Sequence, residues 1–279
     1  MELAVVSREF TSRLTWEEKA RINPLWAVMS VSEFSEADAD PDSWRPEQLE
    51  LFFEKGQLLF DVFLQPPLLR MGLLKPSTFA VEYGSGMGRI LRAVHGEGLG
   101  SAGIDISATM LEHSRRLVPE VEQLHLLEGD GRVPMPDACA DFVYSYAVLQ
   151  HIPRTSQVRR AVLEMCRLLK PGGLLRLQFQ PSSMPFGSSR LSAVRGFNFE
   201  HRSLIYRWVR LQRRLPLPQW LPSVPLVWLQ RHDNWTGVPL RWQTMRRFLL
   251  DGGVRLLSLE RDPAAEWNSV WLLGRKDRS

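Results

Sequence analysis

The chain has 279 residues and a formal net charge of +4, with 44% apolar and 24% charged residues. This composition is typical of a globular protein with a substantial core, so it excludes wholesale disorder. No apolar run is long enough to cross a bilayer, the first residues lack the pattern of a secretory signal, and two cysteines are too few for a disulfide framework. We therefore expect a cytoplasmic protein with no membrane span.

Residues 1–75 are predicted to form an N-terminal helical extension. The pattern between residues 14 and 30 is helical, with Pro24 interrupting it. Residues 45–68 carry apolar side chains at helical spacing, and the adjacent Pro66 and Pro67 are expected to end that helix.

Residues 76–180 alternate between short apolar strands and amphipathic helices, which predicts a parallel sheet covered on both faces. The predicted strands are residues 77–84, 101–107, 121–130, 139–149 and 173–180. The predicted helices between them are residues 88–97, 108–118 and 155–170, the last stopped by Pro171, Gly172 and Gly173.

Residues 242–279 are predicted to complete this core with a last helix, at 241–253, and two strands, at 254–262 and 269–276. The two strands are close enough in the chain to pair antiparallel. The fold class is therefore α/β: a doubly wound, mostly parallel seven-stranded sheet that ends in an antiparallel hairpin.

Residues 181–241 differ in composition from the rest, and we expect them to form a cap insert over the cleft. From Ser182 to Arg247 there are eleven arginines, no lysine and two acids, so this segment alone carries a charge of +9. Half of the ten tryptophans also fall here. Such a surface suits an anionic or amphiphilic substrate; the alternative is a lid whose arginines are simply solvated.

A glycine-rich turn, Gly84-Ser85-Gly86-Met87-Gly88, follows the first strand. Glycines there let the backbone approach a ligand closely and present amides at the start of the next helix. A dinucleotide fingerprint would need a third glycine at position 89, where Arg89 stands instead.

Two further carboxylates end neighbouring strands of the predicted sheet. Asp105 ends the second strand and could accept hydrogen bonds from vicinal ribose hydroxyls. Asp130 ends the third strand, beside Gly131. Because the carboxyl ends of adjacent parallel strands meet at one edge, these loops are expected to converge with the glycine turn on a ligand site.

The ordered segments VEYGSGMGR, GIDIS, EGDGRVPMPDACADFVYSYAVLQHI and LLKPGGLLRL resemble the class I S-adenosylmethionine-dependent methyltransferases. The resemblance covers residues 77–180 and the terminal hairpin. It implies that S-adenosylmethionine is the cofactor. The N-terminal helices and the insert lie outside it, so it does not imply the identity of the substrate.

The resemblance also implies roles for individual residues around that cofactor. The residues that would hold its methionine part are Glu82, Gly84, Gly86 and Gly88. Those that would hold its ribose and adenine are Asp105, Ile106, Asp130 and Gly131. Tyr146 and Ala147, after the fourth strand, would line the face where the methyl group is transferred.

His151, at the edge of the same loop, is the candidate general base, because an imidazole can take a hydroxyl proton near neutral pH. The alternative is that it supports the loop structurally. His201 and His232, in the insert, are the other candidate bases. No spacing of His, Asp or Glu predicts a metal site.

These features predict O-methylation of a small-molecule or sugar-containing metabolite by in-line methyl transfer. The alternative is a methyltransferase that acts on nucleic acid, or on another large anionic substrate, through the basic insert. Residues 145–151 lack an Asn/Asp-Pro-Pro-type tetrapeptide, which argues against methylation of a base amino group.

The same residues argue against two other classes of protein. The glycine turn and Asp105 argue against a non-catalytic partner protein that only keeps the fold. Arg89 and the terminal hairpin argue against a nicotinamide-dependent oxidoreductase. The sequence leaves the oligomeric state open.

Overall fold

The computed structural model describes residues 8–127, 131–181, 237–238, 240–262 and 269–278, with side chains from residue 15 onward. The cap insert predicted at 181–241 therefore falls almost entirely outside the described residues. Within the described part of the chain, no helix is long and apolar enough to cross a membrane.

Seven strands form one sheet in the order β3-β2-β1-β4-β5-β7-β6. The strands are β1 (Phe79–Tyr83), β2 (Gly100–Asp105), β3 (Gln123–Leu126), β4 (Ala140–Ser145), β5 (Leu169–Phe179), β6 (Val254–Arg261) and β7 (Val270–Lys276). The first five are parallel, whereas β7 runs antiparallel to both β5 and β6. The predicted fold class is confirmed, including the antiparallel hairpin.

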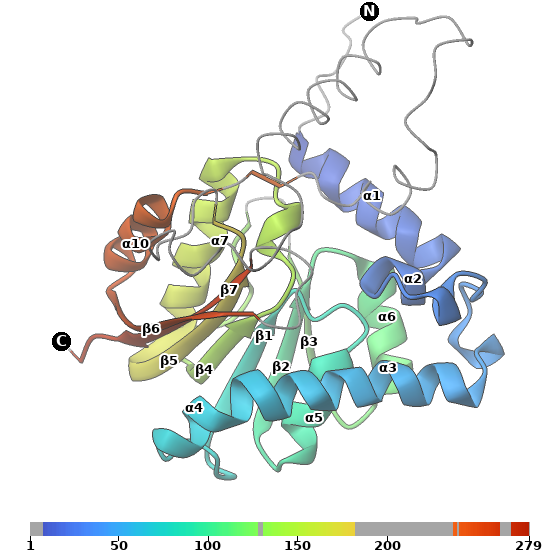
Figure 1. The fold of residues 1–279 in the computed structure, drawn as a ribbon, viewed down its shortest axis with the longest axis horizontal. Coiled ribbons are helices and arrows are strands. Elements are labelled where there is room, and N and C mark those ends of the chain that lie inside the picture. The colour runs from blue at the N-terminus through green and yellow to red at the C-terminus, as the bar shows by residue number, and fades with distance from the viewer. Residues whose placement is uncertain (1–7, 128–130, 182–236, 239, 263–268, 279) are drawn as a thin grey trace, which may run out of the picture.

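Helices cover both faces of this sheet (Figure 1). The helices of the core are α5 (Arg89–Gly96), α6 (Ala108–Leu117), α7 (Thr155–Leu168) and α10 (Trp242–Asp251). On one face α7 and α10 bury Val162, Met165 and Phe248 against the strands, and on the other α5 buries Ile90 and Val94. Since both faces are covered, the central strands are buried along most of their length rather than on alternate residues, as parallel strands are.

The N-terminal extension is helical, as predicted. It comprises α1 (Arg8–Ile22), α2 (Pro24–Val28), α3 (Pro46–Leu59), a π-helical turn (Phe60–Leu64) and α4 (Gln65–Arg70). Pro24 is the first residue of α2, a position where the missing amide hydrogen costs nothing.

Pro66 and Pro67 do not end the helix, contrary to the prediction. The π-helical turn precedes them, and α4 begins at Gln65, so both prolines lie in the first turn of a new helical segment. A proline is tolerated there because the first amides of a helix have no partner within it. In the π-helical turn the hydrogen bond spans five residues, since Gln65 N donates to Phe60 O.

A second boundary also differs from the prediction. Helix α7 ends at Leu168, and β5 begins at Leu169, so Pro171, Gly172 and Gly173 lie inside the strand. The register between β4 and β5 shifts at this point, between Ala140 and Phe142. A proline is accepted in a strand at such an irregularity, because no ladder hydrogen bond is lost there.

Candidate functional site

The glycine turn lies between β1 and α5, at the carboxyl edge of the sheet. Gly84, Gly86 and Gly88 all have positive φ, at 81°, 53° and 84°. At Gly84 space is limiting as well, since a Cβ atom there would lie 2.2 Å from Cγ2 of Val148. Only glycine therefore allows the turn to lie directly against the loop that follows β4.

Hydrogen bonds tie this turn to the end of β2. Gly84 N and Ser85 N both donate to Ile104 O, at 2.7 and 2.9 Å. Gly86 N donates to Asp105 Oδ2 at 2.8 Å, and Ser107 N donates to Asp105 Oδ1 at 2.9 Å. The Asp105 carboxylate is thus held in one orientation, and each of its oxygens keeps a lone pair for a further donor.

Burial raises the pKa of Asp105, and the hydrogen bonds from Ser107 and Gly86 oppose that rise. The adjacent Ile106 is partly exposed. The structure therefore brings Asp105 and Ile106 together with the three glycines, as the sequence predicts.

The loop after β3 approaches the same edge. Leu127 N donates to Asp105 O at 2.8 Å, which aligns the end of β3 with the end of β2. Asp130 lies outside the described residues. Gly131 is described and has φ of 73°.

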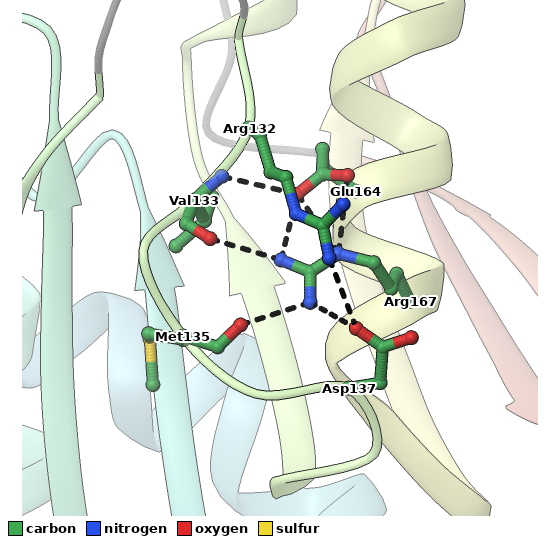
Figure 2. Close-up of polar contacts among 6 residues, drawn as sticks. All are labelled: Arg132, Val133, Met135, Asp137, Glu164 and Arg167. Carbon is green, nitrogen blue, oxygen red and sulfur yellow. Dashed lines mark hydrogen bonds and ion pairs between the residues drawn. The ribbon is translucent and has the colours of Figure 1, made fainter.

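An arginine on α7 holds the rest of this loop, as Figure 2 shows. Arg167 Nη1 donates to Met135 O at 2.9 Å, and Arg167 Nη2 donates to Val133 O at 3.0 Å. The same guanidinium pairs with Glu164 Oε2 at 2.8 Å and with Asp137 Oδ1 at 2.6 Å. One planar cation thereby fixes two backbone carbonyls, so residues 133–137 are anchored to α7.

The loop after β4 contains a strained residue. Ala147 has φ of 57°, a conformation that costs a non-glycine residue about 1–2 kcal/mol. Its amide donates to Gln178 Oε1 at 3.1 Å. Next to it, the Tyr146 ring stacks on Trp271 with centroids 5.5 Å apart. Tyr146 and Ala147 therefore lie in the loop whose next residue, Val148, is directly against Gly84 of the glycine turn.

Glu82, at the end of β1, is 3% exposed. Burial raises its pKa from 4.5 to about 8, although Tyr144 and Arg89 act in the opposite direction. The Tyr144 hydroxyl donates to Glu82 Oε2 at 3.1 Å. The sequence identified this acid, but not that burial holds it protonated at neutral pH.

Arg89 departs from a dinucleotide fingerprint, and no binding role is predicted for it from the sequence. It begins α5 directly after Gly88, and it is 9% exposed. Its guanidinium lies 5.9 Å from the ring centre of Phe52 and 5.7 Å from that of Tyr146. A cation at a helix N-terminus opposes the helix dipole, and this could have been noticed in the sequence.

His151 ends a 3-10 turn, Leu149–His151, at the same edge. Its imidazole makes an edge-to-face contact with Trp16 of α1, with ring centroids 5.1 Å apart. The neighbouring residue on α1, Glu17, bonds to the other side of the site, at Ser107 and Thr109. Helix α1 therefore extends from the loop after β4 to the loop after β2, across the predicted cofactor site.

His201 and His232 lie outside the described residues. Among the described residues, no group of three or more His, Cys, Asp or Glu side chains could hold a metal ion. Where the chain leaves the insert, Gly237 N donates to Gln150 O at 2.9 Å, and Val238 N donates to Ile152 O at 3.2 Å. The insert therefore rejoins the core beside His151.

Residues 81–177 match the family model described as a methyltransferase domain. This part of the chain is therefore similar to a methyltransferase domain. Trans-aconitate 2-methyltransferase of Azoarcus sp. (strain BH72) is 36% identical over 76 residues, 27% of this chain and 28% of that protein. Malonyl-[acyl-carrier protein] O-methyltransferase of Serratia marcescens is 31% identical over 109 residues, 39% of this chain and 40% of that protein.

A solved structure extends the likeness beyond this domain, at the level of the fold alone. Magnesium protoporphyrin IX methyltransferase from Synechocystis PCC 6803, with bound SAM, aligns with a TM-score of 0.54 at 14% identity. The alignment covers 95% of this chain and 97% of that one. The curated relatives, in contrast, are matched over less than half of their length.

The methyltransferase domain contains all the described site residues that the sequence predicted, from Glu82 to His151. It does not contain α1, α3 or the residue that follows α2, which supply Trp16, Glu17, Phe52 and Met29 to the same edge. Sequence reasoning found no signal for these four residues, because their contacts are made only once the helices have packed.

Proposed function

We propose that the chain is an S-adenosylmethionine-dependent methyltransferase that methylates an oxygen of a small organic molecule. The observation that carries this proposal is the Asp105 carboxylate, bonded to both Gly86 N and Ser107 N. A carboxylate held against the glycine turn suits a ligand with vicinal ribose hydroxyls beside a group that needs close backbone approach.

The residues present fit this cofactor. Gly84 lets the glycine turn lie directly against Val148, where any side chain would overlap. Asp105 would accept from the ribose, Ile106 would lie against the adenine, and Asp130 and Gly131 would contact its far edge. Glu82 and the three glycines would hold the methionine end.

When bound, S-adenosylmethionine supplies a methyl group on a positively charged sulfur, which a nucleophile attacks in line. The contribution of the chain is alignment and exclusion of water, which can lower the barrier by about 7–11 kcal/mol. Tyr146 and Ala147 would wall the side from which the acceptor approaches. His151 would take the hydroxyl proton as the acceptor oxygen attacks.

Two relatives support a small organic acceptor, since their names specify trans-aconitate and malonyl-[acyl-carrier protein]. One of those names also specifies methylation of oxygen. A glycosylated acceptor is equally compatible with the site. We further propose the domain organisation given by the sequence, with residues 181–241 as a cap over this edge.

Calorimetry with S-adenosylhomocysteine tests the cofactor. The wild type should bind it, and Asp105→Ala should weaken binding by about 10- to 100-fold, through loss of charged hydrogen bonds to the ribose. Glu112→Ala is the matched control, because Glu112 is an exposed acid in α6, the helix that follows Asp105 in the chain. Binding of a nicotinamide dinucleotide, with no heat from S-adenosylhomocysteine, would contradict the proposal.

A further inference from the structure

The Arg89 guanidinium is enclosed by protein but is poorly supplied with acceptors. Its Nε is fully buried and has no hydrogen-bond partner. Its Nη1 donates to Met29 Sδ at 3.2 Å, and a thioether is a weak acceptor. A guanidinium carries five N–H donors, so most of the hydrogen-bonding capacity of Arg89 is unused among the described residues.

The charge of Arg89 is also poorly balanced. It stands at the positive end of α5, where the helix dipole disfavours a cation. Among the described residues, Glu82 is the only carboxyl group that acts on its charge. That carboxyl already accepts from Tyr144, and burial raises its pKa to about 8, so it is largely neutral at pH 7.

The surroundings of Arg89 hold it in place without neutralising it. Phe52 of α3 and Tyr146 lie against the guanidinium, at 5.9 and 5.7 Å between Cζ and the ring centres. Aromatic faces attract a cation but accept no in-plane hydrogen bonds. Apart from the contact with Met29, the N–H donors of the guanidinium therefore have no acceptor among the described residues, and a carboxylate is the group that matches a fork bidentately.

We propose that Arg89 is the binding residue for a carboxylate group in the site. This inference rests on the proposed function, because that proposal names the ligands bound next to Arg89. The preference of Arg89 for a carboxylate follows from its own contacts. The carboxylate could belong to the methionine end of the cofactor, which Glu82 and the three glycines are proposed to hold. It could equally belong to an acidic acceptor, because Arg89 lies against Tyr146, which we propose to line the methyl-transfer side.

Arg89→Met is the informative variant, because it keeps the length of the side chain and its packing between the two rings. Arg92→Met is the matched control: it lies in the same helix, also over an aromatic ring, with Cζ 4.2 Å from the centre of Phe53, but it is exposed. Arg89→Lys keeps the charge without the fork, and it replaces Arg89→Met if that variant fails to fold.

Each protein is titrated with S-adenosylhomocysteine and with its analogue lacking the carboxyl group. The readout is the ratio of the two affinities, which is insensitive to the fraction of protein that is folded. A cofactor carboxylate predicts a ratio of at least about 10 for the wild type and for Arg92→Met, falling to about 1 in Arg89→Met.

Each protein is also titrated with succinate in the presence of S-adenosylhomocysteine. An acidic acceptor predicts succinate binding that Arg89→Met abolishes, while the ratio stays as in the wild type. If Arg89→Met changes neither the ratio nor succinate binding, Arg89 is a packing residue and the inference is wrong.

These results also separate the inference from the proposed function. If neither nucleoside binds the wild type, the cofactor assignment fails, whereas succinate binding lost in Arg89→Met would still support the carboxylate site. If the nucleosides bind but Arg89→Met leaves every affinity unchanged, the function stands and the inference falls. If no ligand binds any of the proteins, both are wrong.

Discussion

The carboxylate of Glu17 accepts a hydrogen bond of 2.8 Å from the hydroxyl of Ser107, which lies 90 residues further along the chain. Ser107 is the N-cap of α6, and its amide bonds to Asp105. The Thr109 hydroxyl also donates to Glu17. This contact therefore connects α1, through Ser107, to Asp105, the residue proposed to bind the ribose.

We expect Glu17→Ala to release α1 from the edge of the sheet, at a cost of about 1–2 kcal/mol, because Ser107 and Thr109 lose their acceptor. Amide hydrogen exchange of residues 15–22 should become faster, while exchange of the central strands should stay unchanged. Glu18→Ala is the control, since Glu18 is the adjacent and exposed acid. Equal exchange in the two variants would mean that the Glu17 contact does not hold the helix.

The same contact should depend on pH. Burial raises the pKa of Glu17, but hydrogen bonds from Thr109 and Ser107 outweigh it, and the net pKa is lowered from 4.5. A lowered pKa adds stability above pH 4.5 that is lost as the pH falls through the folded-state value. Protection of α1 should therefore decrease on acidification in the wild type and change less in Glu17→Ala.

Glu82 should produce the opposite pH dependence of stability in the ligand-free protein. Its folded-state pKa is raised to about 8, so the folded state binds more protons than the unfolded state between pH 4.5 and about 8. Stability contributed by the neutral carboxyl is present below pH 4.5 and is lost as the pH rises to 8, by up to about 1.4 kcal/mol per pH unit.

Denaturant titrations at several pH values test this. Glu82→Gln should remove that slope, because an amide of similar shape does not ionise and can still accept from Tyr144. Glu97→Gln, an exposed change at the far end of α5, should leave the slope as it is. If the wild type and Glu82→Gln have parallel profiles, Glu82 is ionised in the folded protein.

Gly84→Ala should be strongly destabilising, because it combines a positive φ with overlap of Val148. Gly98→Ala is the matched control, since Gly98 has φ of 78° and nothing lies within 4 Å of the added Cβ. Its loss of stability therefore measures the cost of the positive φ alone, about 1–2 kcal/mol.

The double variant Gly84→Ala/Val148→Ala removes the two methyl groups of Val148 that cause the overlap. It should recover part of the stability lost in Gly84→Ala, as measured by thermal unfolding. If the double variant is simply the sum of the two single changes, the close approach of these residues does not limit the turn.

His151→Ala should lower turnover by about 10²–10⁴-fold if His151 is the general base, with cofactor affinity near that of the wild type. The measurement is the rate with a hydroxylated acceptor over a pH series, with His95→Ala in α5 as control. An unchanged pH profile would make His151 a structural partner of Trp16 instead.

The sequence was sufficient for the sheet and for the placement of Gly84, Asp105 and Tyr146 at the ends of its strands. Strand–helix alternation and the position of Gly84, Asp105 and Tyr146 at strand ends are local properties, and parallel strands bring their carboxyl ends together in any fold of this class. The prolines at 66, 67 and 171 misled the prediction, because a π-helical turn and a register shift remove the hydrogen bonds that a proline normally breaks.

Only the tertiary structure determined the surroundings of these residues. The pKa of Glu82 depends on burial beneath the packed helices, and the isolation of Arg89 depends on Phe52 and Met29, which come from segments outside the matched domain. Glu17 and Trp16 carry no local pattern that distinguishes them from a solvated helix face. Contacts between residues 90 or more positions apart follow from how helices pack over the sheet edge, and such contacts leave no periodicity in a single sequence.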